Sequence, residues 1–278
     1  MALSVKKVAG AAPGPSIRRK DPIMTTSTIA NRFAGATVVV TGAGSGIGKA
    51  TATRLLAEGA RVIASDLDAE RLDALSVEVG DAPLMTVVGD VSDDAVIAQI
   101  VEVGEGRITG LVNNAGIMDA FVPTAEIDDA LLERVLRINV TAPMKLMRAV
   151  LPAMVEAGHG RIVNVASEAS IRAGASGTPY ATSKHAVVGL TKSTALFYGP
   201  AGVRVNAVAP GAVATNIEAP FRSELGAQRL GPIMQATVPA PAPATAEQLA
   251  ASITWLLSED SANVNGALLM SDGGWSTI

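Results

Sequence analysis

Short runs of branched apolar residues alternate along the chain with longer stretches that mix apolar and polar positions, beginning near Ala36. Each apolar run ends at Gly, Asp, Asn, Ser or Pro, a pattern typical of buried strands that stop at a turn. We expect strands within residues 36–41, 61–66, 82–90, 108–116, 160–167, 203–210 and 267–274.

The stretches between these runs are long enough for helices, which we expect at 46–59, 68–80, from Ser92 onward, 128–156, 180–197 and 244–259. Pro143 and Pro152 are expected to bend or end the stretch 128–156, because proline lacks the N–H that a helix interior needs. Uniformly apolar strands that alternate with helices predict an α/β fold. The expected architecture is a single-domain, Rossmann-like, doubly wound parallel sheet of about seven strands with helices on both faces.

Residues 1–32 lack this periodicity and mix Pro, Gly, Ser and Thr with basic residues. No apolar segment follows the basic residues, so we expect a flexible tail and not an export signal. The remainder, 33–278, contains every predicted element without a dividing linker and is expected to be the one folded domain.

The composition narrows the classes of function. Hydrophobic residues make up 49% and charged residues 17% of the chain, which allows a large core. No run of about 18 apolar residues occurs, so no transmembrane helix is expected. The net charge of −4 gives no reason to expect nucleic acid. Cysteine is absent, which is compatible with a reducing cytoplasm, and we expect a cytoplasmic location. The two histidines, His159 and His185, lie far apart in the sequence, so no metal site is expected.

A glycine-rich turn, TGAGSGIG at residues 41–48, joins the first predicted strand to the first predicted helix. Glycines let the backbone approach a pyrophosphate, and a helix N-terminus offers free N–H groups and a partial positive charge. By itself the pattern also fits a tight strand-to-helix turn. The cofactor contacts expected from this loop are Gly42, Ser45, Gly46, Ile47 and Gly48.

Asp66 ends the second predicted strand, eighteen residues after Gly48. A carboxylate there can accept hydrogen bonds from both ribose hydroxyls of an adenosine, and it repels a 2′-phosphate. Positions 45 and 67 carry no basic residue that would compensate for it. The sequence therefore predicts NAD and not NADP, although Asp66 would also serve as the N-cap of the next helix.

Tyr180 and Lys184 are four residues apart in a predicted helix, with Ser167 thirteen residues before the tyrosine. Positions i and i+4 share a helix face, so the ammonium can lie near the phenol and lower its pKa from about 10. Such a tyrosine suits proton transfer in alcohol and ketone chemistry. The alternative is an unrelated surface lysine beside a half-buried tyrosine.

With these residues the chain resembles the short-chain dehydrogenase/reductase family over about residues 33–278. The matching motifs are Thr41–Gly48, Asp90-Val91, Asn113-Asn114-Ala115-Gly116, Asn139, Ser167, Tyr180-xxx-Lys184 and Pro210-Gly211. The resemblance implies an NAD(H)-dependent oxidoreductase that interconverts a secondary alcohol and a ketone by direct hydride transfer. It also implies a homotetramer, with a small-molecule substrate as the other partner.

The family resemblance assigns the catalytic roles. Tyr180 is expected to be the general acid/base, and Lys184 to lower its pKa and hold the nicotinamide ribose. Ser167 would polarise the substrate oxygen, and Ser170 is a less well spaced competitor. Asn139 would hold a water that connects Lys184 to solvent, unless it caps a helix break near Pro143.

The resemblance also assigns cofactor contacts outside the glycine-rich turn. Asp90 and Val91 are expected to flank the adenine ring, and Asn114 to touch the adenine ribose. Asn113 is expected to tie strands together. After the Pro210-Gly211 pair, Val213 and Thr215 are expected to meet the nicotinamide carboxamide.

The substrate lid of this family would fall in residues 212–245. Its apolar residues predict an apolar-lined pocket for a small or medium alcohol or ketone: Phe221, Leu225, Leu230, Ile233 and Met234. Two other classes stay open, a non-catalytic dinucleotide sensor and a methyltransferase, but neither accounts for Ser167, Tyr180 and Lys184 together. An enoyl reductase would separate its tyrosine and lysine by six residues, against three here.

Overall fold

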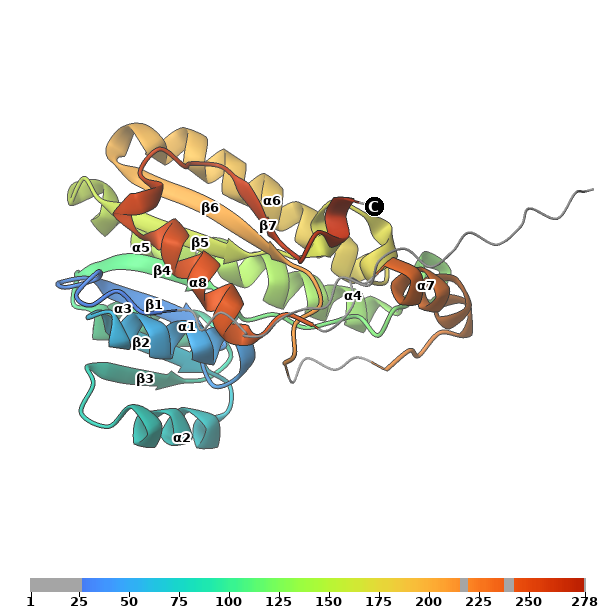
Figure 1. Cartoon of the computed structure of the whole chain (residues 1–278), viewed down its shortest axis with the longest axis horizontal. Coiled ribbons are helices and arrows are strands. Elements are labelled where there is room, and N and C mark those ends of the chain that lie inside the picture. Colours follow the sequence, from blue (N-terminus) through green and yellow to red (C-terminus); the bar gives the residue numbers. More distant parts are fainter. Residues whose placement is uncertain (1–26, 216–219, 238–242, 278) are drawn as a thin grey trace, which may run out of the picture.

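The computed structural model describes residues 27–215, 220–237 and 243–277. Its centre is a parallel sheet with the strand order β3-β2-β1-β4-β5-β6-β7 (Figure 1). The strands are β1 (Thr37–Thr41), β2 (Arg61–Asp66), β3 (Leu84–Val88), β4 (Ile108–Asn113), β5 (Gly160–Val165), β6 (Val203–Pro210) and β7 (Leu268–Ser271). All neighbouring strands pair in parallel. The predicted doubly wound sheet is confirmed.

Helices cover both faces of the sheet, and side chains of β1 show why. Val38 and Val40 belong to the apolar cluster under α1 (Gly46–Ala57), α2 (Ala69–Val79) and α8 (Ala246–Leu257). Val39 points to the opposite face, into the cluster under α3 (Asp94–Gly104) and α5 (Ala142–Glu156). The long α6 (Thr178–Tyr198) covers this second face beside β6. Successive strand residues alternate between faces, so each strand must be apolar throughout.

The predicted helix at 128–156 is one helical path with a change of pitch in its middle. It begins as α4 (Asp129–Leu136), widens into a π-helical turn at Arg137–Thr141, and continues as α5. Pro143 lies in the first turn of α5 and Pro152 inside it. The expectation that either proline ends the helix is wrong. The helix widens into the π-turn just before Pro143 and does not stop there, and α5 continues past Pro152.

The N-terminal boundary of the folded part also differs from the prediction. Residues 27–32 were expected to belong to the flexible tail, but they contact the buried carboxylate of Glu58 and its neighbours. The Ile29 N–H donates to Glu58 Oε1 over 3.3 Å, and Arg32 donates to Ser258 Oγ over 2.8 Å. The remaining residues of the predicted tail, 1–26, lie outside the described residues.

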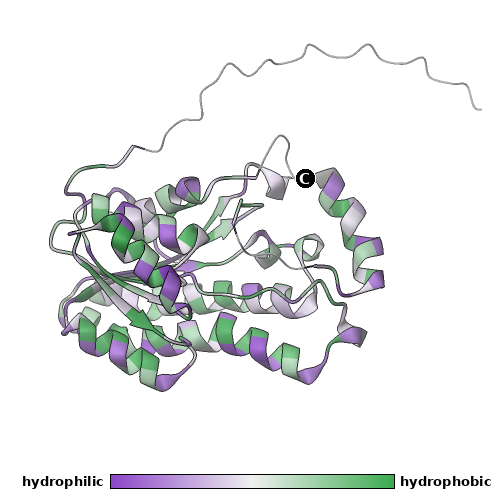
Figure 2. Ribbon diagram, turned by 90° about the horizontal axis from the view of Figure 1, so that it is seen from below, coloured by the Kyte–Doolittle hydropathy of each residue, from purple (hydrophilic) through white to green (hydrophobic). Residues whose placement is uncertain are grey.

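The helices alternate between polar and apolar residues along their length (Figure 2), as expected where one side of a helix packs on a sheet. In the part of the chain that the structure describes, no helix is both long and apolar enough to cross a membrane. After β6 the chain forms α7 (Glu224–Thr237), which packs near the short turn at Ala173–Ala175.

Candidate active site

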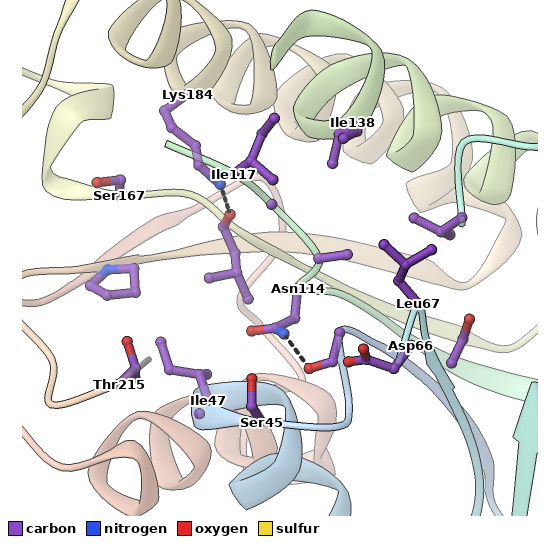
Figure 3. A pocket seen from close by; sticks show the side chains of 18 of the residues that line it. Ser45, Ile47, Asp66, Leu67, Asn114, Ile117, Ile138, Ser167, Lys184 and Thr215 are labelled. Atoms are coloured by element: carbon purple, nitrogen blue, oxygen red, sulfur yellow. Dashed lines mark hydrogen bonds between the residues drawn. The ribbon is translucent and has the colours of Figure 1, made fainter. Parts of the chain in front are cut away.

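A cavity of about 560 Å³ opens at the carboxyl edge of the sheet. It lies where the strand order reverses between β1 and β4, the position at which open parallel sheets bind ligands. The residues that follow β1, β2, β4, β5 and β6 all contribute to its lining. Ser167 and Lys184 lie on one side of the view in Figure 3, and Asp66 and Leu67 on the other.

The glycine-rich turn forms one wall of the cavity. Gly42 and Gly46 have φ angles of 63° and 52°, in the left-handed region that favours glycine. A Cβ at Gly48 would lie 2.0 Å from the Gly42 carbonyl oxygen, so this glycine is required by packing within the loop. Of the five residues predicted to contact a cofactor here, Gly42, Ser45, Gly46 and Ile47 line the cavity, whereas Gly48 does not.

Asp66 lies at the end of β2 and faces the same wall. Its Oδ2 accepts a hydrogen bond from the Gly44 N–H over 2.8 Å, and its Oδ1 accepts one from the Asp68 N–H over 3.1 Å. The N-cap of α2 is Asp68, which accepts from the Arg71 N–H. The alternative that Asp66 caps this helix is therefore wrong.

Three arginines line the cavity without having been predicted: Arg71, Arg134 and Arg137. Arg71 pairs with Asp68, at 3.1 Å between Nε and Oδ2. Arg137 lies 3.5 Å from Asp90 Oδ2. A basic residue in the first turn of α2 is a local signal that could have pointed to Arg71, but nothing local in the sequence places the other two beside β3.

Asp90 and Val91, expected at the adenine ring, line the cavity after β3. Burial raises the pKa of Asp90, but hydrogen bonds from Ser92 and the charge of Arg137 outweigh burial, so this pKa lies below its ordinary value. The carboxylate is thus ionised at neutral pH. Leu67, 73% exposed, leaves an apolar surface open in the same part of the cavity.

The two adjacent asparagines at the end of β4 form different contacts. Asn113 is buried and donates to Asn164 Oδ1 over 2.8 Å, which ties β4 to β5 as predicted. Asn114 lines the cavity, and its Nδ2 donates to the Thr41 and Gly42 carbonyls over 2.9 and 3.2 Å. Its amide therefore fixes the glycine-rich turn.

Tyr180, Lys184 and Ser167 come together at one end of the cavity. Tyr180 is 8% and Lys184 is 4% exposed. Ser167 is close enough to the tyrosine hydroxyl to act against the rise in the pKa of Tyr180. Lys184 Nζ lies 5.4 Å from the centroid of the Tyr180 ring and donates to the Val165 carbonyl over 2.8 Å. The alternative of a surface lysine is wrong, because this ammonium is buried.

Burial dominates the protonation of this pair. It raises the pKa of Tyr180 to about 12, with Asp119 adding to the rise and Ser167 opposing it. It lowers the pKa of Lys184 to about 8. The predicted lowering of the Tyr180 pKa by its ammonium neighbour is therefore wrong for this structure, because loss of hydration has the larger effect.

Of the two serines considered for the candidate site, only Ser167 faces the cavity. Ser167 lines the cavity and caps the short turn at Glu168–Ser170 through a bond from the Ala169 N–H. Ser170 is buried, does not line the cavity, and accepts from the Ser167 N–H over 3.2 Å. Ser170 thus holds the backbone on which Ser167 is presented.

Asn139 lies in the π-turn and is buried outside the cavity lining. It exchanges hydrogen bonds with the Ile117 backbone, both at 2.9 Å, and donates to Ser183 Oγ over 3.1 Å. A Cβ at Gly116 would lie 3.3 Å from Asn139 Oδ1 and 3.5 Å from Lys184 Nζ, so this glycine permits their close approach. The alternative that Asn139 caps a helix break does not hold, because the helical path continues through it.

The segment after β6 provides the remaining wall. Val213 and Thr215 line the cavity, and Val213 forms a parallel bridge with Ala244. The apolar lid residues differ from the prediction. Phe221, Leu225 and Ile233 are 39%, 45% and 45% exposed, and none of the five predicted lid residues lines the cavity. In the described residues, no group of three metal-ligating side chains comes together.

Comparisons with known proteins agree with this arrangement. The family model described as short chain dehydrogenase matches residues 36–226. Levodione reductase of Leifsonia aquatica is 38% identical over 261 residues, which cover 90% of this chain and 98% of the relative. The 3beta-hydroxysteroid dehydrogenase 2 of Eggerthella lenta is 39% identical over 252 residues, covering 88% and 96%.

Solved structures agree as well. The crystal structure of levodione reductase has a TM-score of 0.80 at 38% identity, covering 88% of this chain and 99% of its own. A protein assigned as an NAD(P)-dependent gluconate 5-dehydrogenase from Beutenbergia cavernae, with NADP bound at low occupancy, has a TM-score of 0.79 at 38% identity, covering 88% and 98%. With its sheet, its glycine-rich turn and its Ser167, Tyr180 and Lys184 cluster, the chain belongs to the short-chain dehydrogenase family and is an oxidoreductase of that family.

Proposed function

We propose that this protein is an NAD(H)-dependent oxidoreductase that interconverts a secondary alcohol and a ketone, with Tyr180 as the general acid/base. The observation that carries the proposal is one cavity lined by Ser167, Tyr180 and Lys184 together with the glycine-rich turn and Asp66. A proton donor and a dinucleotide cradle in the same cavity are what direct hydride transfer requires.

The cavity fits a nicotinamide dinucleotide. Backbone N–H groups of the glycine-rich turn lie at the start of α1, where a pyrophosphate is favoured. A Cβ at Gly46 would lie 3.1 Å from Thr215, so glycine keeps the approach between the two walls open. Asp66 and Asn114 would hold the adenosine half, and Lys184, Val213 and Thr215 the nicotinamide half. When bound, the cofactor supplies or accepts the hydride.

The residues of the chain manage the proton and the substrate oxygen. At neutral pH Tyr180 carries its proton, since burial raises its pKa to about 12, and it is therefore ready to donate to a carbonyl oxygen during reduction. Ser167 would hold the same oxygen by a second hydrogen bond. Asn139 would keep Lys184 in place through the Ile117 segment.

The cofactor preference is testable at Asp66. We expect the catalytic efficiency with NADH to exceed that with NADPH, because the carboxylate repels a 2′-phosphate. Asp66→Ser should shift this ratio toward NADPH by about 10-fold or more, since a repulsion of roughly 1.4 kcal/mol corresponds to that factor. Asp73→Ser, at an exposed position on α2, is the matched control and should leave the ratio unchanged. A wild-type enzyme that prefers NADPH would refute the assignment.

For the substrate we propose an apolar secondary alcohol or ketone. Support comes from the stacked rings of Phe121 and Phe221, 4.3 Å apart, beside the first turn of α6, and from relatives named for levodione and 3beta-hydroxysteroids. A panel of hydroxysteroids, levodione, gluconate and hydroxyacyl thioesters, read by NADH absorbance, tests the proposal. NADH binding without turnover of any compound would favour a sensor instead.

We further propose a cytoplasmic homotetramer. Leu196 and Phe197 near the end of α6 are each 74% exposed, and Met144 on α5 is 49% exposed. Large apolar side chains exposed on the surface of a helix are typical of subunit contacts. Light scattering should give four times the chain mass of 28.2 kDa. A monomer at micromolar concentration would contradict this expectation.

A further inference from the structure

Asp119 is a buried carboxylate close to Tyr180 that has no part in the motifs of the sequence. Its side chain is fully buried. Its Oδ2 accepts from the Tyr180 N–H over 2.9 Å, and its Oδ1 accepts from the N–H groups of Gly177 and Phe121 over 3.2 and 3.0 Å. Among the residues that the structure describes, no Lys, Arg or His forms an ion pair with it. Its charge is stabilised instead by backbone N–H groups at the N-terminus of α6.

The contact between the Asp119 segment and α6 is tight. A Cβ at Gly177 would lie 2.6 Å from Asp119 Oδ2 and 2.5 Å from the Val122 nitrogen. The Thr178 N–H also donates to the Val122 carbonyl over 3.0 Å. The first turn of α6, which presents Tyr180, is therefore fixed to residues 119–122 by hydrogen bonds from the N–H groups of Gly177, Thr178 and Tyr180.

The same segment has a strained backbone that reaches toward the lid. Ala120 and Phe121 have φ angles of 55° and 60°, an unusual conformation for two consecutive residues other than glycine. The Arg222 N–H donates to the Ala120 carbonyl over 3.1 Å, and the Phe121 ring stacks on Phe221. Such a conformation persists only where its surroundings hold it, and Asp119 supplies the bond to Phe121.

We propose that Asp119 is a positioning residue that fixes the Tyr180 hydroxyl through the first turn of α6 and joins this turn to the segment before α7. The inference rests on the proposed role of Tyr180 as proton donor. A positioning residue of this kind raises the rate because a proton donor is effective only within hydrogen-bond reach of the reacting oxygen.

The negative charge of Asp119 also acts on the acidity of the phenol. It contributes to raising the pKa of Tyr180, together with the larger effect of burial and against the effect of Ser167. Lys184 faces the ring at 5.4 Å. From the neighbouring elements, Glu168 pairs with Arg172, and Arg134 of α4 lines the cavity near Asp90. Removal of the Asp119 charge should therefore make Tyr180 more acidic.

The test compares Asp119→Asn with Asp128→Asn by kcat, KM for NADH and the pH profile of reduction. Asp119→Asn keeps the size of the side chain but loses the charge and one acceptor. We expect kcat to fall about 10-fold, KM for NADH to stay within about twofold, and the alkaline limb of the profile to move to lower pH by about half a unit or more. Asp128 caps α4 by accepting from the Leu131 N–H, so Asp128→Asn makes the same change away from Tyr180 and should alter neither kcat nor the profile.

Two further variants, Gly177→Ala and Tyr180→Phe, allow the inference to be tested even if Asp119→Asn does not fold. If Asp119→Asn does not fold, Gly177→Ala separates the same segments without changing charge and should lower kcat by a similar factor. An unchanged kcat and pH limb in the variant that folds would overturn the inference. Tyr180→Phe is measured alongside: if it is inactive while Asp119→Asn matches the wild type, only this inference fails, whereas an active Tyr180→Phe removes the proposed function itself.

Discussion

Tyr180→Phe is expected to abolish turnover and to leave NADH binding nearly unchanged. The substitution removes the hydroxyl that donates the proton, which lines the cavity beside Ser167. It keeps the buried ring, so the packing of α6 should survive. Positioned proton transfer contributes about 10²–10⁴-fold to a rate, and we expect a loss of kcat in this range. Steady-state kinetics with the best substrate and NADH titration by fluorescence measure the two quantities.

The second tyrosine of the chain provides the matched control. Tyr198 ends the same helix, is 36% exposed and does not line the cavity. Tyr198→Phe removes one hydroxyl from α6 without touching the cavity and should retain the wild-type kcat. If Tyr180→Phe keeps more than about a tenth of the activity, Tyr180 is not the proton donor, since that residual rate lies above the whole range expected for general acid catalysis.

The fold was largely predictable because its strands are buried on both faces. A run such as TVVVT in β1 must be apolar at every position, which makes it visible in the sequence. The ends of elements were less predictable. Arg32 is fixed by Ser258 and Asp260, more than two hundred residues away, and no local pattern indicates such a contact. The π-turn before Pro143 likewise depends on the bonds of Asn139 to the Ile117 segment.

The candidate site was predictable where particular residue types stand at a fixed spacing in the chain, and not elsewhere. Ser167, Tyr180 and Lys184 were found this way. Asp119 and Arg137 were not, because they reach the site only through the packing of β4 and α4 against other elements. The acidity of Tyr180 was predicted with the wrong sign. Spacing revealed the neighbouring ammonium, but the burial of both groups is a property of the folded structure alone.

Lys184→Met is expected to impair chemistry and cofactor binding together. One ammonium would hold the nicotinamide ribose and also support the proton donor, so kcat should fall by about 10²-fold or more while the Kd for NADH rises about 10-fold. Burial lowers the pKa of Lys184 to about 8. In the wild type, NADH affinity should therefore decline as the pH is raised through about 8, whereas in Lys184→Met it should not.

The same substitution should stabilise the fold at neutral pH. The pKa of Lys184 falls from 10.5 to about 8 on folding, so the unfolded chain binds more protons between these values and the stability of the wild type rises with pH across this window. Below the window the buried ammonium destabilises the fold by up to about 3 kcal/mol, at 1.36 kcal/mol per pKa unit. Lys184→Met removes this destabilisation, but it also removes the stabilising hydrogen bond from Lys184 to the Val165 carbonyl. Its free energy of unfolding should exceed that of the wild type at pH 7, and the gap should close as the pH rises.

Lys192→Met is the matched control, at an exposed position on the same helix two turns further on, and it should change neither kcat nor the pH dependence of stability. Urea denaturation at several pH values gives the stabilities, and fluorescence titration gives the NADH affinities. A Lys184→Met variant that is less stable than the wild type at pH 7 would mean that Lys184 stabilises the fold through its bond to Val165. A variant that is more stable but still turns over at the wild-type rate would mean that the ammonium is buried without a part in the reaction. Only a gain in stability together with a loss of activity fits a lysine retained for catalysis at the expense of folding.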